Sequence, residues 1–334
     1  MSKSMWWDLK ETLSYNALFN FVVGSRGCGK TYGFKKWAIE DFIKNGYQFI
    51  YVRRFKTEMT KKAKETFFDS VKHEFPDHEF KGLPDGTYYI DGKLAGQTRY
   101  LSSAKSEELP MVNKICFDEF VTNDEVHHNY LKDEVTFFCE LYETIARMRP
   151  VKVFFFGNAI TWANPYFTFF KIYKPNNKKQ IATCQDGQVL IQITNNDDYI
   201  KAKEETPFGK LMKGTRYGNY AVHNDFYLDS SVGIAKRTSN SQYMLAFKIN
   251  DDYVGLWYDL HTGISYLSNK YAIGAGRVYA LTNSDHDYNT VLLKVRPRPN
   301  WLEHMVRQYR NGALFCENEM IRRQMLDILS IVGV

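Results

Sequence analysis

The sequence predicts an α/β protein with a central, mainly parallel sheet in its first half and a smaller α+β domain in its second half. In the first half, short apolar runs alternate with segments of helical periodicity, which is the pattern of a parallel sheet covered by helices on both faces. In the second half, four closely spaced apolar runs precede two helical segments, which indicates an antiparallel meander followed by helices. A polar segment with turn-forming residues separates the two patterns between residues 195 and 240.

The elements of the first half are expected where each pattern begins and ends. Strands are expected at residues 19–24, 47–54, 114–120 and 151–159, and helices at 30–44 and 133–147. The charged segment 56–75 has helical periodicity and predicts a further helix. Residues 87–96 predict a hairpin, because the pair Asp91-Gly92 favours a tight turn.

The second half and the domain boundaries complete the predicted organisation. Strands are expected at 242–250, 253–260, 263–268 and 277–283, and helices at 300–311 and 317–331. The predicted parts are an N-terminal domain at 1–197, a linker at 198–230 and a second domain at 231–334. The aromatic run 255–258 suits either stacking on nucleic-acid bases or packing in a core, and its spacing favours the core.

Length and composition indicate a packed globular protein. Of the 334 residues, 44% are hydrophobic and 16% are aromatic, which suffices for two domains that each bury a core. No apolar run reaches the ~18 residues of a membrane span, and the start MSKSMWWDLK lacks the apolar region of a signal peptide. We therefore expect an intracellular protein without a membrane partner. Its five cysteines are scattered without CxxC spacing, so we expect reduced thiols and neither a disulfide framework nor a zinc site.

The net charge is +6 and falls mainly in the second half, where residues 171–334 carry 21 Lys or Arg and 16 Asp or Glu. Such a basic excess permits contact with a polyanion without requiring it. An ordinary solvated surface explains the same charge equally well.

The segment GSRGCGKT matches the phosphate-binding pattern GxxxxGK[ST] and lies between an apolar strand and a helix, as a P-loop requires. Its glycines let the backbone curve so that N–H groups face phosphate oxygens at a helix N-terminus. Lys30 is expected to reach the β- and γ-phosphates of ATP, and Thr31 to bind Mg²⁺. The predicted nucleotide-binding residues are Gly24, Ser25, Arg26, Gly27, Cys28, Gly29, Lys30, Thr31 and Asp118.

A P-loop also needs an acidic residue at the end of a neighbouring buried strand, and KICFDE supplies one. Asp118 ends the apolar run and is the second predicted Mg²⁺ ligand. Glu119 follows it and is the predicted catalytic carboxylate, because a base beside the metal suits the activation of water. Two solvated carboxylates at a strand end are the alternative.

Further polar residues are placed to act on the γ-phosphate. Asn158 lies at the end of the strand expected at 151–159 and is predicted to sense the γ-phosphate or to position the attacking water, unless it only caps a turn. Arg26 lies inside the P-loop, and Arg147 follows a helix at a place suited to an arginine finger donated to a neighbouring subunit. Other candidate cations, for each of which a solvated surface position is the alternative, are Arg53, Arg54, Lys56, Lys105 and Arg149.

Several segments resemble the genome-packaging ATPases of tailed bacteriophages, the large-terminase class, and more closely the packaging motor ATPases of small short-tailed phages that use a packaging RNA. The resemblance lies in segments 13–32, 48–56, 75–80, 88–96, 101–120 and 157–167, with a weaker continuation at 208–218 and 255–263. It is therefore specific in the first half and weaker in the second.

This resemblance implies an additional-strand catalytic-glutamate (ASCE) ATPase fold and an ATP-driven motor that translocates double-stranded DNA into a preformed prohead. It implies a homomeric ring of five subunits in the host cytoplasm, bound transiently to the portal vertex, with the portal or connector and the packaging RNA as partners. The family's roles fall on Lys30 and Thr31 in the P-loop, on Asp118 as metal ligand and on Glu119 as catalytic residue. Further matches are Arg26 within the loop, Arg147 and Lys105 as trans-acting cations, and Arg53, Arg54 and Lys56 in the lid and subunit contact.

Large terminases usually carry an RNase H-like nuclease whose first central strand bears a metal-binding carboxylate. The matching strand here, residues 243–249, has no Asp or Glu, and the available acids lie in turns or at strand ends: Asp251, Asp252, Asp259 and Asp285. We therefore expect a nuclease-like fold without the active site that binds nucleic acid or the portal. The alternatives are a full terminase with an active nuclease and a nucleotide-regulated binding module without productive turnover.

Overall fold

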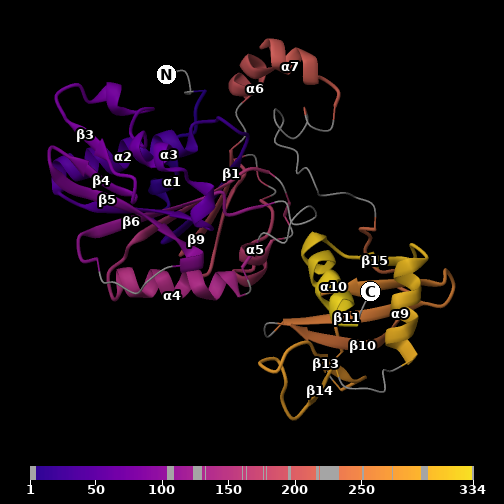
Figure 1. Cartoon of the computed structure of the whole chain (residues 1–334). Helices are drawn as coiled ribbons and strands as arrows, with labels where there is room; N and C mark the ends of the chain where they lie inside the picture. The colour runs from indigo at the N-terminus through magenta and orange to yellow at the C-terminus, as the bar shows by residue number, and fades with distance from the viewer. Residues whose placement is uncertain are drawn as a thin grey trace. The chain divides into compact units, whose positions relative to one another are not determined.

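In the computed structural model, the chain divides into two compact units, Met1–Thr161 with Phe170–Leu228, and Trp162–Phe169 with Asp229–Val334 (Figure 1). The residues that the structure describes are 5–103, 109–122, 130–131, 133–159, 161–162, 164–175, 177, 179–194, 197–215, 218, 233–249, 252–272, 274–294 and 300–332. Within these ranges no helix combines the length and the apolar character needed to cross a membrane.

The first unit contains a nine-stranded sheet in the order β3-β4-β5-β2-β6-β7-β1-β9-β8. The strands from β5 to β9 in this order pair in parallel, and antiparallel pairs occur only at the edges, between β3, β4 and β5 and between β8 and β9. This confirms the predicted α/β class with a mainly parallel sheet. The strands are β1 (Phe19–Gly24), β2 (Gln48–Arg53), β3 (Phe80–Gly82), β4 (Thr87–Ile90), β5 (Lys93–Tyr100), β6 (Val112–Asp118), β7 (Lys152–Gly157), β8 (Ile181–Cys184) and β9 (Val189–Thr194).

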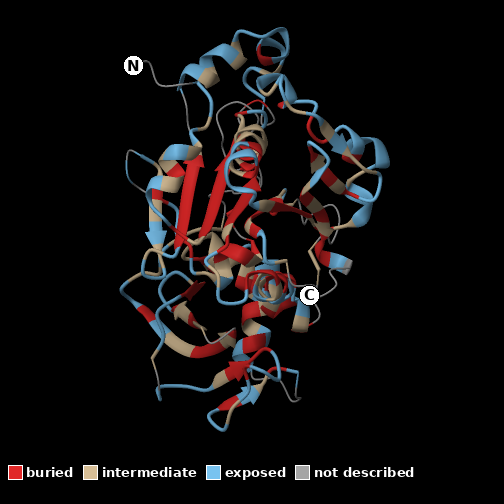
Figure 2. Ribbon diagram, turned by 90° about the vertical axis from the view of Figure 1, so that its left-hand side faces the viewer, coloured by how far each residue is buried: buried red, intermediate tan, exposed pale blue. Residues whose placement is uncertain are grey.

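Helices cover both faces of this sheet, and the side chains of β7 show the arrangement. Phe154 and Phe156 contact Phe34 of α2 (Lys30–Asn45) on one face. Phe155 points to the other face and contacts Phe138 of α4 (Glu134–Ala146), with ring centroids 4.7 Å apart. The central strands are therefore buried along their length (Figure 2). Such burial explains why their sequences are continuous apolar runs and not alternating ones.

The segment that follows β2 differs from the prediction of one helix over 56–75. It forms the 3₁₀ turns η1 (Lys56–Glu58) and η2 (Lys72–Glu74) and the short helix α3 (Lys61–Glu65). The prediction was wrong because tertiary packing overrides helical periodicity here: Phe67 stacks on Tyr88 of β4 at 4.1 Å. The predicted hairpin is confirmed, since β4 and β5 pair around Asp91 (φ 49°) and Gly92 (φ 73°).

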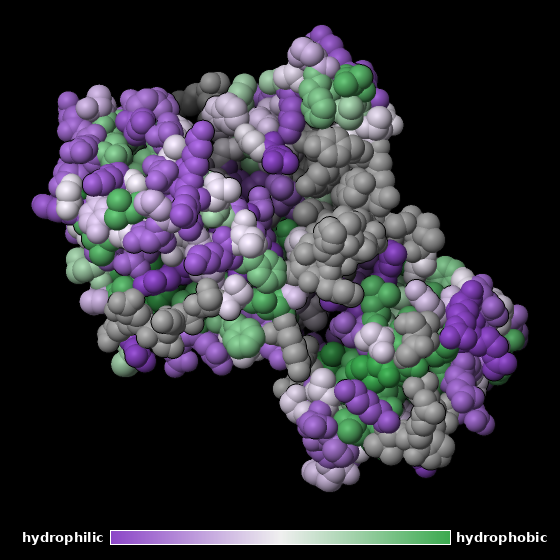
Figure 3. Space-filling model, viewed as in Figure 1, coloured by the Kyte–Doolittle hydropathy of each residue, from purple (hydrophilic) through white to green (hydrophobic). Residues whose placement is uncertain are grey.

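The remaining elements of the first unit are short. They are α1 (Leu9–Ser14), η3 (Leu101–Ser103), α6 (Asp197–Glu204) and α7 (Pro207–Met212). The last two lie in the segment predicted as a linker at 198–230, and the division between the units falls at its end. Exposed apolar side chains gather on α7, where Phe208 and Leu211 are 53% and 70% exposed (Figure 3).

The second unit contains a six-stranded sheet in the order β14-β13-β10-β11-β12-β15. Strands β10, β11 and β12 form the predicted antiparallel meander, but β13 lies beside β10 and pairs with it in parallel. The expectation that 277–283 continues the meander was therefore wrong, because the chain crosses back and adds this strand beside β10 and not beside β12. The elements are α5 (Pro165–Phe169), β10 (Ser241–Ile249), β11 (Asp252–Asp259), β12 (Ile264–Ser268), β13 (Val278–Ala280), β14 (Thr290–Leu292), α9 (Asn300–Arg310), β15 (Leu314–Cys316) and α10 (Glu319–Val332).

The core of the second unit lies between its sheet and the helices α9 and α10. Leu256 of β11 belongs to this core, together with Met305 of α9 and Ile328 of α10. Trp257 lies beside Arg237, whose guanidinium is 4.0 Å from the ring centroid, and its indole N–H donates to the carbonyl of Lys270 at 2.8 Å. Leu256 and Trp257 of the run 255–258 therefore both have contacts within the unit.

Candidate nucleotide-binding site

The P-loop joins the end of β1 to the start of α2, and its conformation depends on glycine. Gly27 (φ 85°) and Gly29 (φ 94°) have positive φ angles that other residues rarely adopt. Gly24 ends the strand where a Cβ atom would lie only 1.6 Å from Oγ1 of Thr194 on β9. The sequence motif therefore forms the curved loop that it predicts, with its N–H groups at the N-terminus of α2.

A cavity of about 350 Å³ opens over this loop. Nine of the residues predicted from the sequence line it: Arg26, Gly27, Cys28, Gly29, Lys30, Thr31, Asp118, Glu119 and Asn158. Gly24 and Ser25 are buried at the base of the loop. Four lining residues were not foreseen: Tyr32, Ser70, Phe156 and Gly157.

Lys30 is folded back onto its own loop. Its Nζ atom donates to the carbonyl oxygens of Gly24 at 3.0 Å and Ser25 at 3.1 Å, and the residue is only 8% exposed. These neutral acceptors hold the ammonium group at the floor of the cavity, where it can exchange them for phosphate oxygens.

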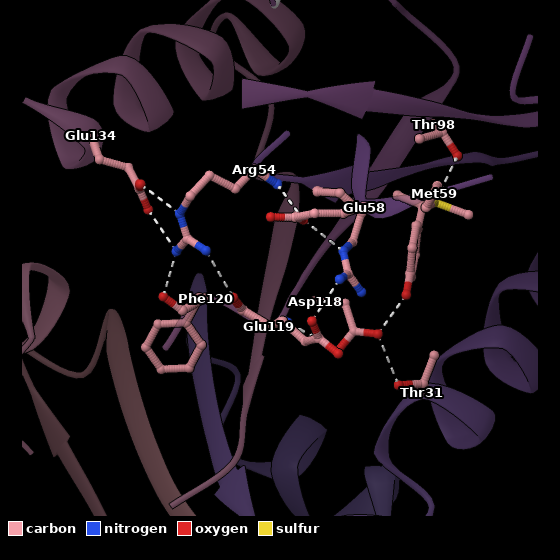
Figure 4. Close-up of polar contacts among 11 residues, drawn as sticks. Thr31, Arg54, Glu58, Met59, Thr98, Asp118, Glu119, Phe120 and Glu134 are labelled. Atoms are coloured by element: carbon pink, nitrogen blue, oxygen red, sulfur yellow. Dashed lines mark hydrogen bonds and ion pairs between the residues drawn. The ribbon is translucent and has the colours of Figure 1, made fainter. Parts of the chain in front are cut away.

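Asp118 lies at the end of β6, opposite the P-loop. Its Oδ2 atom accepts hydrogen bonds from Oγ1 of Thr31 at 3.1 Å and from the hydroxyl of Tyr51 on β2 (Figure 4). A hydroxyl and a carboxylate oxygen side by side are the kind of oxygen ligands that Mg²⁺ prefers. Thr31 and Asp118 therefore fit the metal that would accompany a bound nucleotide. Burial raises the pKa of Tyr51 well above its ordinary value, and the negative charge of Asp118 adds to this effect. Tyr51 therefore stays a proton donor at neutral pH.

Glu119 directly follows the strand and has a positive φ angle of 60°. Its side chain is 58% exposed, and its Oε2 atom lies 2.6 Å from Nη2 of Arg53. The Nε atom of the same arginine contacts Glu58 at 3.0 Å. The carboxylate is thus on the cavity wall but is paired with Arg53, which must release it before it can act as a base.

The candidate cations occupy different environments. Arg26 is exposed beside the cavity, and its backbone carbonyl accepts from the hydroxyl of Tyr199 at 2.7 Å. Arg147 is exposed at the end of α4 with a φ angle of 52°, and Lys56 is exposed on η1. Lys105 lies outside the described residues.

Two arginines proposed from the sequence as surface or subunit-contact cations have hydrogen-bond partners within the chain. Arg149 donates to the backbone carbonyls of Leu109 at 2.9 Å and Pro110 at 2.8 Å. Arg54 is 2% exposed and pairs with Glu134. For Arg54 the expectation of a surface position was wrong, because its buried guanidinium group is paired inside the fold. Arg149 is half-buried, and its action in trans stays a prediction.

Two of the candidate acids in the second unit, Asp259 and Asp285, accept hydrogen bonds within local turns. Asp259 accepts from Thr238 at 2.5 Å and from the backbone of His261 at 2.8 Å, and Asp285 accepts from Thr282 at 2.5 Å. Asp252 begins β11, and Asp251 lies outside the described residues. Within the part of the chain that is described, no three acidic, His or Cys side chains gather as a metal site would require.

Comparisons with known proteins agree with this geometry. The profile of the family described as podovirus DNA encapsidation protein (Gp16) matches residues 1–331. The chain is 37% identical over 326 residues to the DNA packaging protein of Bacillus phage phi29, which covers 96% of both sequences.

Solved structures give the same result. A chain of the bacteriophage phi29 viral genome packaging motor assembly is similar with a TM-score of 0.77 and 34% identity, covering 98% of this chain and 99% of the other. The N-terminal domain of the DNA packaging ATPase from phi29 matches with a TM-score of 0.52 and 38% identity, covering 59% of this chain and the whole of that domain.

Proposed function

Because the chain belongs to the podovirus DNA encapsidation protein (Gp16) family, we propose that it is a motor that uses ATP hydrolysis to translocate double-stranded viral DNA into a preformed prohead. The observation that carries this proposal is the cavity in which a complete P-loop faces Asp118 and Glu119. A nucleotide-binding module without turnover would need no second carboxylate beside the metal ligand.

Each polar residue of the cavity has a separate role in hydrolysis. Lys30 would exchange the carbonyls of Gly24 and Ser25 for the β- and γ-phosphates, and Thr31 and Asp118 would hold the metal. Glu119, once released by Arg53, takes a proton from the attacking water. Mg²⁺, when bound with ATP, neutralises charge that develops on the phosphate oxygens.

Other residues act on the same phosphate in this proposal. Asn158 follows β7 on the cavity wall and orients the attacking water, and Arg26 folds over the γ-phosphate. Arg147 is the arginine finger that reaches the nucleotide site of the neighbouring subunit, and its exposure at the end of α4 suits this role. Lys105 is a second trans-acting cation by family resemblance alone.

We further propose that the protein works as a homomeric ring of five subunits, in the host cytoplasm and transiently at the prohead portal vertex. Its partners are DNA, the packaging RNA and the portal or connector. The second unit is an RNase H-like domain without nuclease activity that binds nucleic acid or the portal, and 198–230 links it to the ATPase domain. The engagement of Asp259 and Asp285 in turns supports this, and Mg²⁺- or Mn²⁺-dependent cleavage of supercoiled plasmid would argue for the full terminase instead.

The test is ATP hydrolysis by the purified protein with and without double-stranded DNA. We expect DNA-stimulated turnover that Glu119→Gln abolishes while nucleotide binding persists. Glu140→Gln, which changes an exposed glutamate of α4, is the matched control and should hydrolyse ATP like the wild type. Tight nucleotide binding without turnover, in the presence of DNA, RNA or proheads, would favour the binding module.

A further inference from the structure

A buried ion pair lies directly behind the catalytic corner. Arg54 follows β2 and Glu134 begins α4, and each residue is 2% exposed. The Nε atom of Arg54 is 2.7 Å from Oε2 of Glu134, and its Nη2 atom is 2.9 Å from Oε1 (Figure 4). The pair is therefore bidentate, which fixes the plane of the guanidinium group as well as its position.

The remaining donors of this guanidinium reach the backbone of the catalytic corner. Nη1 donates to the carbonyl of Glu119 at 3.2 Å, and Nη2 donates to the carbonyl of Phe120 at 2.7 Å. Glu119 has a φ angle of 60°, which is unfavourable for a residue with a side chain and persists only where neighbouring groups hold it. Arg54 supplies two of the bonds that do so.

Stability alone is a weak reason for a buried ion pair. Removing two charges from water is costly, and apolar residues of similar size often replace such a pair without loss of stability. The guanidinium group of Arg54 is held in one plane and donates to backbone carbonyls, which apolar residues cannot do. It can therefore control the direction in which the Glu119 side chain leaves the backbone.

We propose that Arg54, oriented by Glu134, is a positioning residue for the catalytic glutamate. It fixes the backbone at Glu119 and Phe120 so that the Glu119 carboxylate projects into the nucleotide cavity. The inference rests on the proposed hydrolysis and adds a component that the P-loop and the acidic strand end do not contain.

Arg54 differs in this from the adjacent Arg53. Arg53 pairs with the Glu119 carboxylate itself, so that this contact must break during each turnover. Arg54 binds the carbonyl groups behind it, and these bonds can persist throughout the cycle. Substitution of Arg54 should therefore lower kcat without changing the affinity for nucleotide, because the binding residues of the P-loop are untouched.

Two variants test the proposal. Arg54→Lys keeps the charge but loses the fork, and the double variant Arg54→Met with Glu134→Leu replaces the pair by apolar side chains of similar volume. For both we expect an unchanged nucleotide Kd and a kcat that falls at least about tenfold, as misplacement of a catalytic group predicts. A modest fall in melting temperature should accompany this, because the carbonyls of Glu119 and Phe120 lose their donor. Glu140→Gln on the exposed face of α4 is the control.

Hydrogen exchange at the amides of residues 118–121 gives a readout that does not need turnover. We expect faster exchange in both variants than in the wild type. Full kcat with unchanged exchange in either variant would overturn the proposal. A parallel loss of melting temperature, nucleotide binding and kcat in both variants would also overturn it, since the pair would then be only structural. If the wild type itself does not hydrolyse ATP, the proposed function fails, and the exchange data then decide only whether Arg54 and Glu134 hold the backbone at residues 118–121.

Discussion

Single residues around the cavity acquire their chemistry from neighbours that are distant in the sequence. Lys35 lies one helical turn after Thr31, where its Nζ atom donates to the carbonyl of Phe67 at 2.6 Å and lies 4.0 Å from the centroid of its ring. Burial lowers the pKa of Lys35 to about 8, although the nearby negative charge of Asp118 acts in the opposite direction. Tyr51 shows the opposite effect, because burial and the negative charge of Asp118 both raise its pKa.

Tyr51→Phe removes one of the two hydroxyl groups that donate to Asp118. Loss of a hydrogen bond that orients a metal ligand typically costs about tenfold or more in metal affinity, so the Mg²⁺ concentration for half-maximal hydrolysis should rise by about this factor. Tyr88→Phe is the control, because its buried hydroxyl contacts Thr98 and not the site. Equal Mg²⁺ dependence of the two variants would contradict the role given to Tyr51.

The lowered pKa of Lys35 predicts a pH dependence of stability. Between pH 8 and the ordinary lysine pKa of 10.5, the folded protein loses this proton while the unfolded chain keeps it. Unfolding then takes up a proton, so the contribution of Lys35 to the free energy of unfolding becomes more favourable as the pH rises, by at most about 1.4 kcal/mol per pH unit. Below pH 8 both states are protonated, and the cost of burying the charge is fully present.

Denaturant unfolding of the wild type and Lys35→Met between pH 7 and 10 measures this effect. The difference between their free energies of unfolding should move in favour of the wild type above pH 8. The same comparison with Lys44→Met, at the exposed end of α2, should show no such trend. A pH-independent difference for Lys35→Met would contradict the assignment.

At the scale of secondary-structure elements, the ends of three parallel strands assemble the site. β1 leads into the P-loop, β6 ends in Asp118 and β7 leads into Asn158, and the register of β6 against β7 places Asp118 beside Phe156. Gly157 ends β7 where a Cβ atom would lie 2.8 Å from the ring of Phe120, so this corner tolerates no larger residue without movement. The site therefore depends on close packing at one edge of the sheet.

The β4–β5 hairpin gives a prediction for an element outside the site. Gly92 has a φ angle of 73° and open space around it. In Gly92→Ala the added Cβ atom therefore meets no clash, and the only cost is the strain of a positive φ angle in a residue with a side chain. We expect a loss of about 1 kcal/mol in the free energy of unfolding. Lys93→Ala, an exposed change in the next residue, should have a smaller effect in the same denaturant titration. A stabilising effect of Gly92→Ala would show that the turn differs from that described.

At the scale of the whole molecule, each unit has its own core and its own sheet. The nucleotide cavity is built entirely from the first unit. A trans-acting arginine would come from a neighbouring subunit, so its action is a property of the assembly and not of one chain. Arg147 meets the requirement of exposure at a helix end.

Mixing two inactive variants tests action in trans. Glu119→Gln keeps Arg147 but lacks the base, and Arg147→Ala keeps the base but lacks the arginine. Each should be inactive alone in the assembled motor, and a mixture should recover part of the DNA-stimulated hydrolysis, because some interfaces then combine an intact Glu119 with an intact Arg147. Full activity of Arg147→Ala alone would exclude the finger role.

The sequence by itself determined the features that local chemistry dictates. The P-loop, the Asp118-Glu119 pair, the Asp91-Gly92 turn and the alternation of strands with helices follow from side-chain period and glycine conformation, which act over a few residues. Most of the predicted helices and strands begin and end within one or two residues of the observed bounds. The predicted nucleotide-binding residues line one cavity or lie beneath it.

Tertiary structure alone decided what depends on contacts between distant segments. The sequence could not show that Tyr51, Arg53 and Arg54 converge on Asp118 and Glu119, because the pairing of β2 with β6 sets that register. Nor could it place β13 beside β10 or divide residues 56–75 into short turns, since packing against other strands overrides local propensity there. The buried pairing of Arg54 with Glu134 joins residues 80 positions apart, and only the folded chain brings them together.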